Sequence, residues 1–135
     1  MIIPFCAPSG TGKTTFLLKL CSALLGQSRS VALIKSTHHN LLKPENTNTD
    51  SSKYQTLGIP FLISSDTEEM NHFAQHQTVD FVLIEGGRSL NLPSVVLKRG
   101  LLDSSWTPPL SILKTIDINQ QAAVVQTSKW LTSQL

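Results

Sequence analysis

Residues 7–15, Ala-Pro-Ser-Gly-Thr-Gly-Lys-Thr-Thr, hold the side chains best arranged for chemistry. They follow a short apolar run and lead into Phe-Leu-Leu-Lys-Leu, which is typical of a helix. A strand, a glycine-rich turn, Gly-Lys-Thr and a helix form the pattern of a phosphate-binding P-loop, in which backbone N–H groups and the helix N-terminus surround an anion. Lys13 would reach the terminal phosphates of a nucleotide, and the Thr14 hydroxyl would bind Mg²⁺. The predicted nucleotide contacts in this segment are Ser9, Gly10, Thr11, Gly12, Lys13, Thr14 and Thr15.

The first position of the motif departs from the strict pattern. Ala7 stands where a glycine is expected. Because a Cβ atom disfavours a positive φ, we expect the loop to be slightly altered there.

Two further charged residues follow apolar runs that predict buried strands. Glu85 follows residues 81–84, and Lys35 follows residues 31–34. At a strand end, Glu85 could hold Mg²⁺ through water or orient an attacking water, and with Lys13 it is the predicted catalytic pair. Lys35 could pair with a phosphate or with Glu85. The alternatives are that Glu85 is a solvated loop carboxylate and that Lys35 is an ordinary lysine at a strand end.

The other candidate site residues are less constrained by their surroundings. Arg88, beside two glycines, is better placed than Arg99 to stabilise phosphate charge. Asp50 would either assist the metal or cap the short helix expected after it. His38 and His39 are adjacent and would point to opposite sides of an extended segment, which argues against joint zinc binding. We expect His38 to contact nucleotide, substrate or a second subunit; the alternative is an exposed polar side chain with no ligand.

Apolar runs alternate with helical stretches along the whole chain. Expected strands lie near residues 2–6, 31–34, 59–63, 81–84, 94–98 and 110–113, and expected helices near 13–25, 51–57, 68–76 and 119–135. In the last helix, apolar positions at Ala122, Val125, Trp130 and Leu131 suggest the buried face. This alternation predicts an α/β fold with a mostly parallel sheet, whose ligand site lies beyond the carboxyl ends of the strands. The polar residues after three of the strands should therefore converge.

Composition limits the class of protein. The 135 residues fit a single domain, and 40% hydrophobic with 15% charged residues fits an ordinary globular chain. A net charge of +2 is too small to indicate nucleic acid or an anionic membrane as partner. The apolar runs are too short for a membrane span, the N-terminus lacks the features of a signal peptide, and two cysteines suggest buried thiols. We expect a cytoplasmic protein.

Taken together, these motifs resemble the MobB family, adapter proteins of molybdopterin-guanine dinucleotide synthesis. The resemblance is carried by residues 9–15, by Leu-Ile-Lys-Ser-Thr-His-His at 33–39 and by Leu-Ile-Glu-Gly at 83–86, with weaker support at 50–51, 95–97 and 117–119. It implies a P-loop fold that binds GTP with Mg²⁺ and hydrolyses it slowly at best. It also implies a homodimer that assists a MobA-like nucleotidyltransferase, the enzyme that joins GMP to molybdopterin, and makes molybdopterin itself a candidate ligand.

No local motif predicts which nucleobase the protein prefers. Residues 114–117, Lys-Thr-Ile-Asp, have one residue too many between the lysine and the aspartate for a guanine-binding Asn-Lys-x-Asp motif. The segment between Gly100 and Leu110 is short for the family. Two alternatives therefore stay open: a P-loop small-molecule kinase, and a non-catalytic interaction protein that kept the P-loop fold.

Overall fold

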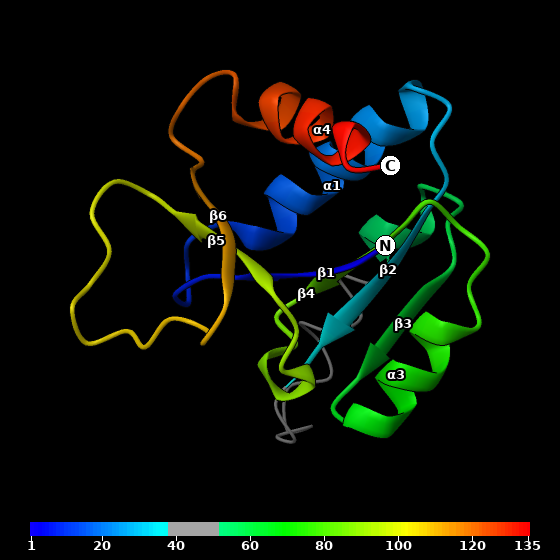
Figure 1. Ribbon diagram of the computed structural model, residues 1–135. Helices are drawn as coiled ribbons and strands as arrows, with labels where there is room; N and C mark the ends of the chain where they lie inside the picture. Colours follow the sequence, from blue (N-terminus) through cyan, green and yellow to red (C-terminus); the bar gives the residue numbers. More distant parts are fainter. Residues whose placement is uncertain (38–51) are drawn as a thin grey trace.

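The computed structural model describes residues 1–37 and 52–135 (Figure 1). Six strands form one sheet in the order β3-β2-β4-β1-β5-β6, and every neighbouring pair is parallel. The α/β fold with a parallel sheet is thus confirmed. The strands are β1 (Ile2–Cys6), β2 (Val31–Ser36), β3 (Phe61–Ser64), β4 (Phe81–Glu85), β5 (Ser94–Lys98) and β6 (Ile112–Asp117).

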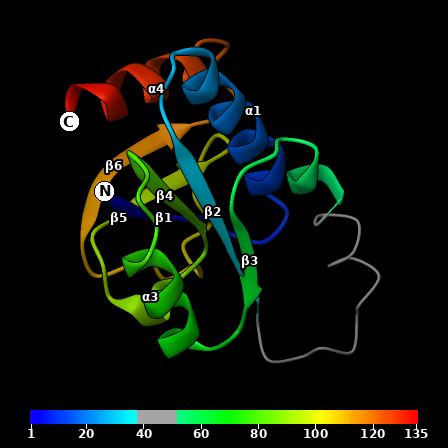
Figure 2. The ribbon, with the colours of Figure 1, turned by 90° about the vertical axis from the view of Figure 1, so that its right-hand side faces the viewer.

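Helices cover both faces of this sheet (Figures 1 and 2). On one face α1 (Lys13–Gly26) packs beside α4 (Ala123–Ser133), while α3 (Thr67–Gln75) covers the other face. A 3₁₀ turn, η1 (Arg88–Leu90), follows β4, and residues 52–55 are helical. Asp66 caps the start of α3, because its carboxylate accepts the backbone N–H groups of Glu68 and Glu69.

The alternation of side chains along the strands divides the core in two. Odd-numbered residues of β2 and β4, such as Leu33 and Leu83, pack with the α1 side chains. Even-numbered residues, such as Ile34 and Ile84, pack with Met70 of α3. Both layers are buried, which explains why these strands are continuous apolar runs.

Two predictions for the C-terminal third are wrong in detail. The last strand is Ile112–Asp117 rather than 110–113, and Leu110 is fully exposed. In α4 the buried residues are Ala123, Thr127, Ser128 and Leu131, whereas Ala122 and Val125 are exposed. Leu131 is buried as predicted and Trp130 packs against the core, but Thr127 and Ser128 supply half of the buried residues, so apolar spacing located the face only in part.

β5 lies inside the sheet, between β1 and β6. The edges are β3 and β6. Cys6 and Cys21 are buried free thiols, as expected. Over residues 1–37 and 52–135, none of the helices has the length and apolar character needed to cross a bilayer.

Candidate phosphate-binding site

The glycine-rich turn connects the end of β1 to the start of α1. Gly10 and Gly12 have φ values of +79° and +99°, in the left-handed region that favours glycine. Thr11 is buried between them and fixes the turn, because its hydroxyl donates to the Pro8 carbonyl at 2.6 Å and its N–H to the same oxygen at 3.3 Å. Alanine is compatible with the backbone at position 7, because the described non-glycine residues with positive φ are Ser28 and Asn91.

The start of α1 is built without a side-chain cap. Gly12 is the N-cap residue and offers no side-chain hydrogen bond to the first turn. The N–H groups at the start of an α-helix lack partners within the helix and carry a partial positive charge. The turn and the helix start can therefore bind an anion.

Glu85, at the end of β4, lies opposite this helix start. The parallel register pairs it with Phe5 of β1 on one side and with Lys35 of β2 on the other. Both Lys35 and Glu85 occupy odd positions of their strands, so strand alternation places both side chains on the α1 face. Only 5% of Glu85 is exposed.

Three side chains from different elements hold the Glu85 carboxylate. The Thr14 hydroxyl, in the first turn of α1, donates to Oε1. The Lys35 ammonium lies 3.4 Å from Oε2, and the Tyr54 hydroxyl donates to Oε2 at 3.3 Å. The predicted contact between Lys35 and Glu85 is thus present, and Thr14 joins them.

Hydroxyl and carboxylate oxygens are the ligands that Mg²⁺ prefers, and Mg²⁺ usually takes one or two protein carboxylates together with phosphate and water. Thr14 and Glu85 form such a donor set beside an anion-binding turn. No cluster of three or more His, Cys, Asp or Glu side chains suited to a metal occurs within residues 1–37 and 52–135. The site therefore fits a metal held jointly with phosphate better than a closed protein cage.

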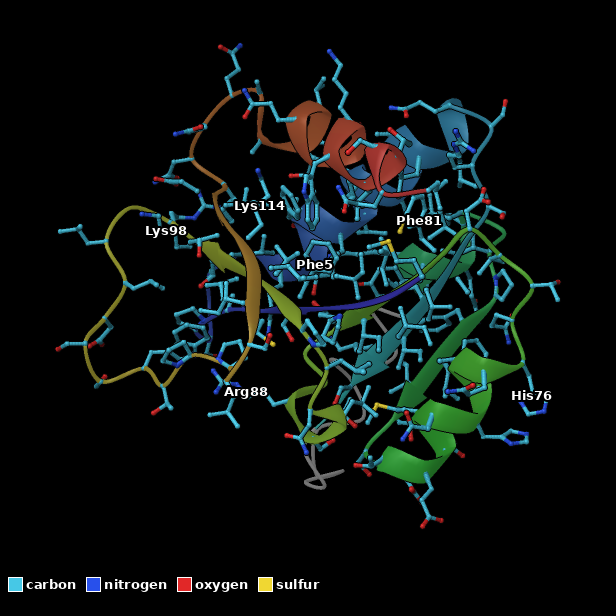
Figure 3. All side chains as sticks on the ribbon, in the orientation of Figure 1. Phe5, His76, Phe81, Arg88, Lys98 and Lys114 are labelled. Carbon is cyan, nitrogen blue, oxygen red and sulfur yellow. The ribbon has the colours of Figure 1, made fainter. Side chains whose placement is uncertain are left out.

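Arg99 is the arginine that contacts the turn. It follows β5, the neighbour of β1 in the sheet, and its Nε donates to the Thr11 carbonyl at 3.2 Å. Its Nη1 also donates to Asn119 Oδ1 at 2.7 Å. Arg88, which sequence reasoning preferred, lies instead with its guanidinium 4.8 Å from the centre of the Trp106 ring, on the side of the sheet away from α4 (Figure 3).

The remaining predicted site residues differ in what the structure describes. Ser9 and Thr15 are exposed on the turn and on α1. His38, His39 and Asp50 lie outside the described residues. Sequence reasoning missed Tyr54, which is fully buried against Phe61 with a ring-centre distance of 5.2 Å. A lone tyrosine in a polar stretch carries no motif, so no sequence signal pointed to it.

A six-stranded parallel sheet, flanked by helices and with a glycine-rich turn between its β1 strand and α1, is consistent with a P-loop NTPase-like fold. The family model "Molybdopterin guanine dinucleotide synthesis protein B" (MobB) matches residues 2–115, and the chain belongs to this family. The molybdopterin-guanine dinucleotide biosynthesis adapter protein of Haemophilus influenzae is 29% identical over 106 residues. This match covers 67% of the chain and 59% of the length of that relative.

Proposed function

We propose that this protein binds GTP with Mg²⁺ and acts as an adapter in molybdenum cofactor biosynthesis. The observation that carries the proposal is the contact between Thr14, at the start of α1, and the buried carboxylate of Glu85. This contact brings an anion-binding turn next to a carboxylate oxygen ligand, and a metal-bound nucleoside triphosphate requires both.

Each part of the site has a separate role in this proposal. The turn from Ser9 to Gly12 and the N–H groups of α1 bind the phosphates, and the Lys13 ammonium neutralises their terminal charge. Thr14 and Glu85 would hold Mg²⁺, which would neutralise negative charge on the phosphates. Tyr54 positions Glu85 by donating a hydrogen bond to Oε2.

Binding is proposed as the main activity, with hydrolysis slow at best. Fast hydrolysis needs an arginine or a comparable group free to stabilise charge on the transferred phosphoryl. Arg99 has two of its donor nitrogens committed to Thr11 and Asn119, and Arg88 stacks on Trp106. A protein that binds GTP and keeps it is suited to present the nucleotide to another enzyme.

The partner is proposed from the family and from the relative's name as an adapter. A MobA-like nucleotidyltransferase, which consumes GTP, is the partner that such an adapter would serve. Homodimer formation and contact with molybdopterin stay predictions from the family resemblance.

The metal part of the proposal is tested by calorimetric titration of GTP with and without Mg²⁺. We expect Mg²⁺ to tighten binding to the wild type, and Glu85→Gln to abolish most of this gain while binding without Mg²⁺ changes little. Tyr54→Phe keeps the ring and should reduce the Mg²⁺-dependent gain only in part, because Thr14 and Lys35 still hold the carboxylate.

Asp80→Asn is a control that removes the charge of a partly buried aspartate, whose carboxylate accepts the Ser30 N–H far along the chain from the turn. An equal loss with and without Mg²⁺ in Glu85→Gln would show that Glu85 shapes the turn rather than binding the metal.

A further inference from the structure

The solvent-facing side of α3 carries two histidines one helical turn apart. Met70 and Ala74 form the buried side of this helix. His72 and His76 are exposed, and Figure 3 shows His76 directed outward, away from the sheet. Residues four apart are neighbours on a helix surface. The two imidazole rings accordingly lie with their centres 4.0 Å apart and their planes inclined by 32°.

This histidine pair is separate from the phosphate-binding turn. The turn leads into α1, whereas α3 covers the opposite face of the sheet (Figure 2). The pair therefore has no part in the nucleotide site described above, and any ligand it takes is a different one.

A backbone contact fixes which ring nitrogen of His76 can bind a metal. Its Nδ1 lies 2.7 Å from the carbonyl oxygen of His72. Because a carbonyl oxygen only accepts hydrogen bonds, Nδ1 carries the proton, and in the neutral ring Nε2 carries the lone pair. Histidines that bind metals are commonly held in this way, with the second ring nitrogen donating to a carbonyl or carboxylate oxygen. His76 is thus oriented for coordination through Nε2.

The separation of the two rings suits a shared ion. Zinc binds imidazole nitrogen at about 2.0–2.1 Å, so two nitrogens on one such ion lie at most about 4 Å apart. The 4.0 Å between the ring centres is compatible with this spacing. Both side chains are exposed, so small rotations of the rings can direct both lone pairs at one ion.

The charges on α3 favour a cation at this position. His72 lies in the last turn of the helix and His76 is its C-cap residue, and a helix C-terminus carries a partial negative charge. Glu68 and Glu69 add two carboxylates in the first turn, and the sequence of α3 contains neither lysine nor arginine.

We propose that His72 and His76 form a binding site for a divalent transition metal ion, with water or an external ligand completing its coordination. Among the residues that the structure describes, His, Cys, Asp and Glu form no group of three or more suited to a metal, so the pair is an open site rather than a closed cage. Imidazole suits Cu²⁺, Ni²⁺ and Zn²⁺, whereas Mg²⁺ prefers oxygen. Cu²⁺ should bind most tightly, following the general order of affinities for divalent ions.

The test is calorimetric titration of Ni²⁺ into the full chain without nucleotide, in a buffer with excess Mg²⁺ to occupy oxygen sites. We expect the wild type to bind a single Ni²⁺ per chain. His72→Ala and His76→Ala should each weaken binding at least about tenfold, because loss of even an outer partner of a metal ligand costs that much.

Two controls separate joint binding by the pair from binding by single histidines. The chain has four histidines, and replacing His38 and His39 together by alanine should leave the Ni²⁺ affinity unchanged. Asn71→His combined with His72→Asn keeps the number of histidines but moves one to a neighbouring exposed position. The two rings then no longer share a helix face, and binding should weaken as in His72→Ala. Circular dichroism checks that each variant keeps its helices.

The site is overturned if the wild type does not bind Ni²⁺, or if His72→Ala or His76→Ala binds it as tightly as the wild type. Loss of binding on replacement of His38 and His39 would place the metal elsewhere in the chain. Unchanged binding in the variant with the exchanged positions 71 and 72 would show that single exposed histidines bind the ion, and would overturn the pair as its site.

Discussion

Substituting alanine for Gly12 tests how tightly Arg99 packs on the phosphate-binding turn. Gly10 provides the matched comparison, because both glycines have positive φ, +99° at Gly12 and +79° at Gly10. A Cβ at Gly10 would meet no atom within 4 Å, whereas one at Gly12 would lie 3.1 Å from Arg99 Nη2 and 3.7 Å from Ile118 Cδ1. The two variants thus share backbone strain and differ in the contact with Arg99.

The backbone strain is about 1–2 kcal/mol for each alanine, the cost of a left-handed conformation for a residue with a Cβ. Gly12→Ala must also displace the Arg99 guanidinium, which weakens its 3.2 Å hydrogen bond to the Thr11 carbonyl. A hydrogen bond contributes about 0.5–1.5 kcal/mol net. We therefore expect Gly12→Ala to lower the free energy of unfolding by about 1 kcal/mol more than Gly10→Ala does.

Urea denaturation followed by the fluorescence of Trp106 and Trp130 measures this difference. With an m-value of about 2 kcal/mol/M, 1 kcal/mol corresponds to a midpoint shift of about 0.5 M. In an Arg99→Ala background, the cost of Gly12→Ala should fall to that of Gly10→Ala. Equal costs for the two glycine variants, or an unchanged cost for Gly12→Ala without Arg99, would refute the packing of Arg99 on the turn.

Three further predictions concern the core and the titrating groups. In α4, Leu131 is fully buried and Val125 is 52% exposed. In urea denaturation, Leu131→Ala should therefore lower the free energy of unfolding by about 2–5 kcal/mol and Val125→Ala by less than about 0.5 kcal/mol. Similar losses for the two variants would contradict the described buried face of α4. Burial raises the pKa of the Cys21 thiol to about 12, so little thiolate is present at pH 8. We expect this thiol to react with a disulfide reagent no faster than the chain unfolds. Immediate reaction would contradict its burial. The hydrogen bond from the Asn119 N–H is the main cause that lowers the pKa of the Asp117 carboxyl. The ionised carboxylate therefore stabilises the fold above its unfolded pKa, and this stabilisation is lost as the pH falls through the folded pKa. Asp117→Asn should thus flatten the decline of the urea midpoint below about pH 4, and parallel pH profiles for the variant and the wild type would contradict this.

Local sequence predicted the centre of the sheet because its strands are buried on both faces. The runs at 31–34 and 81–84 are continuously apolar, and each ends in a charged residue, Lys35 or Glu85. Parallel strands place such residues together at the carboxyl ends of the strands, and the register of β2 with β4 makes Lys35 and Glu85 direct neighbours. Their 3.4 Å contact is one of the two interactions that the sequence suggested for Lys35.

The C-terminal elements were harder to predict because their polar and apolar residues do not follow burial. β6 is an edge strand whose Ile112 to Thr115 are exposed, so no apolar run marks it. In α4, Thr127 and Ser128 are buried because their hydroxyls donate to the carbonyls of Ala123 and Val125, one turn earlier. Such hydrogen bonds remove the cost of burying a hydroxyl and hide the helical face from a hydrophobic pattern.

The position of Arg99 depends on strand order, which the sequence did not reveal. β5 lies beside β1 in the sheet, and this neighbour relation brings the residue after β5 to the turn after β1. Arg88 follows β4, which also neighbours β1, but the chain turns through Gly86 and Gly87 there. Both glycines have positive φ, and Arg88 reaches Trp106 instead.

The most direct test of the central claim is calorimetric titration of Mg²⁺-GTP into the wild-type protein and Lys13→Ala. Lys129→Ala, which removes an exposed lysine from α4, is the matched control for loss of one positive charge. We predict GTP binding about tenfold tighter than ATP binding in the wild type, lost in Lys13→Ala and kept in Lys129→Ala. Equal binding of GTP by wild type and Lys13→Ala, or no binding by the wild type, would contradict the claim that this turn holds a nucleotide.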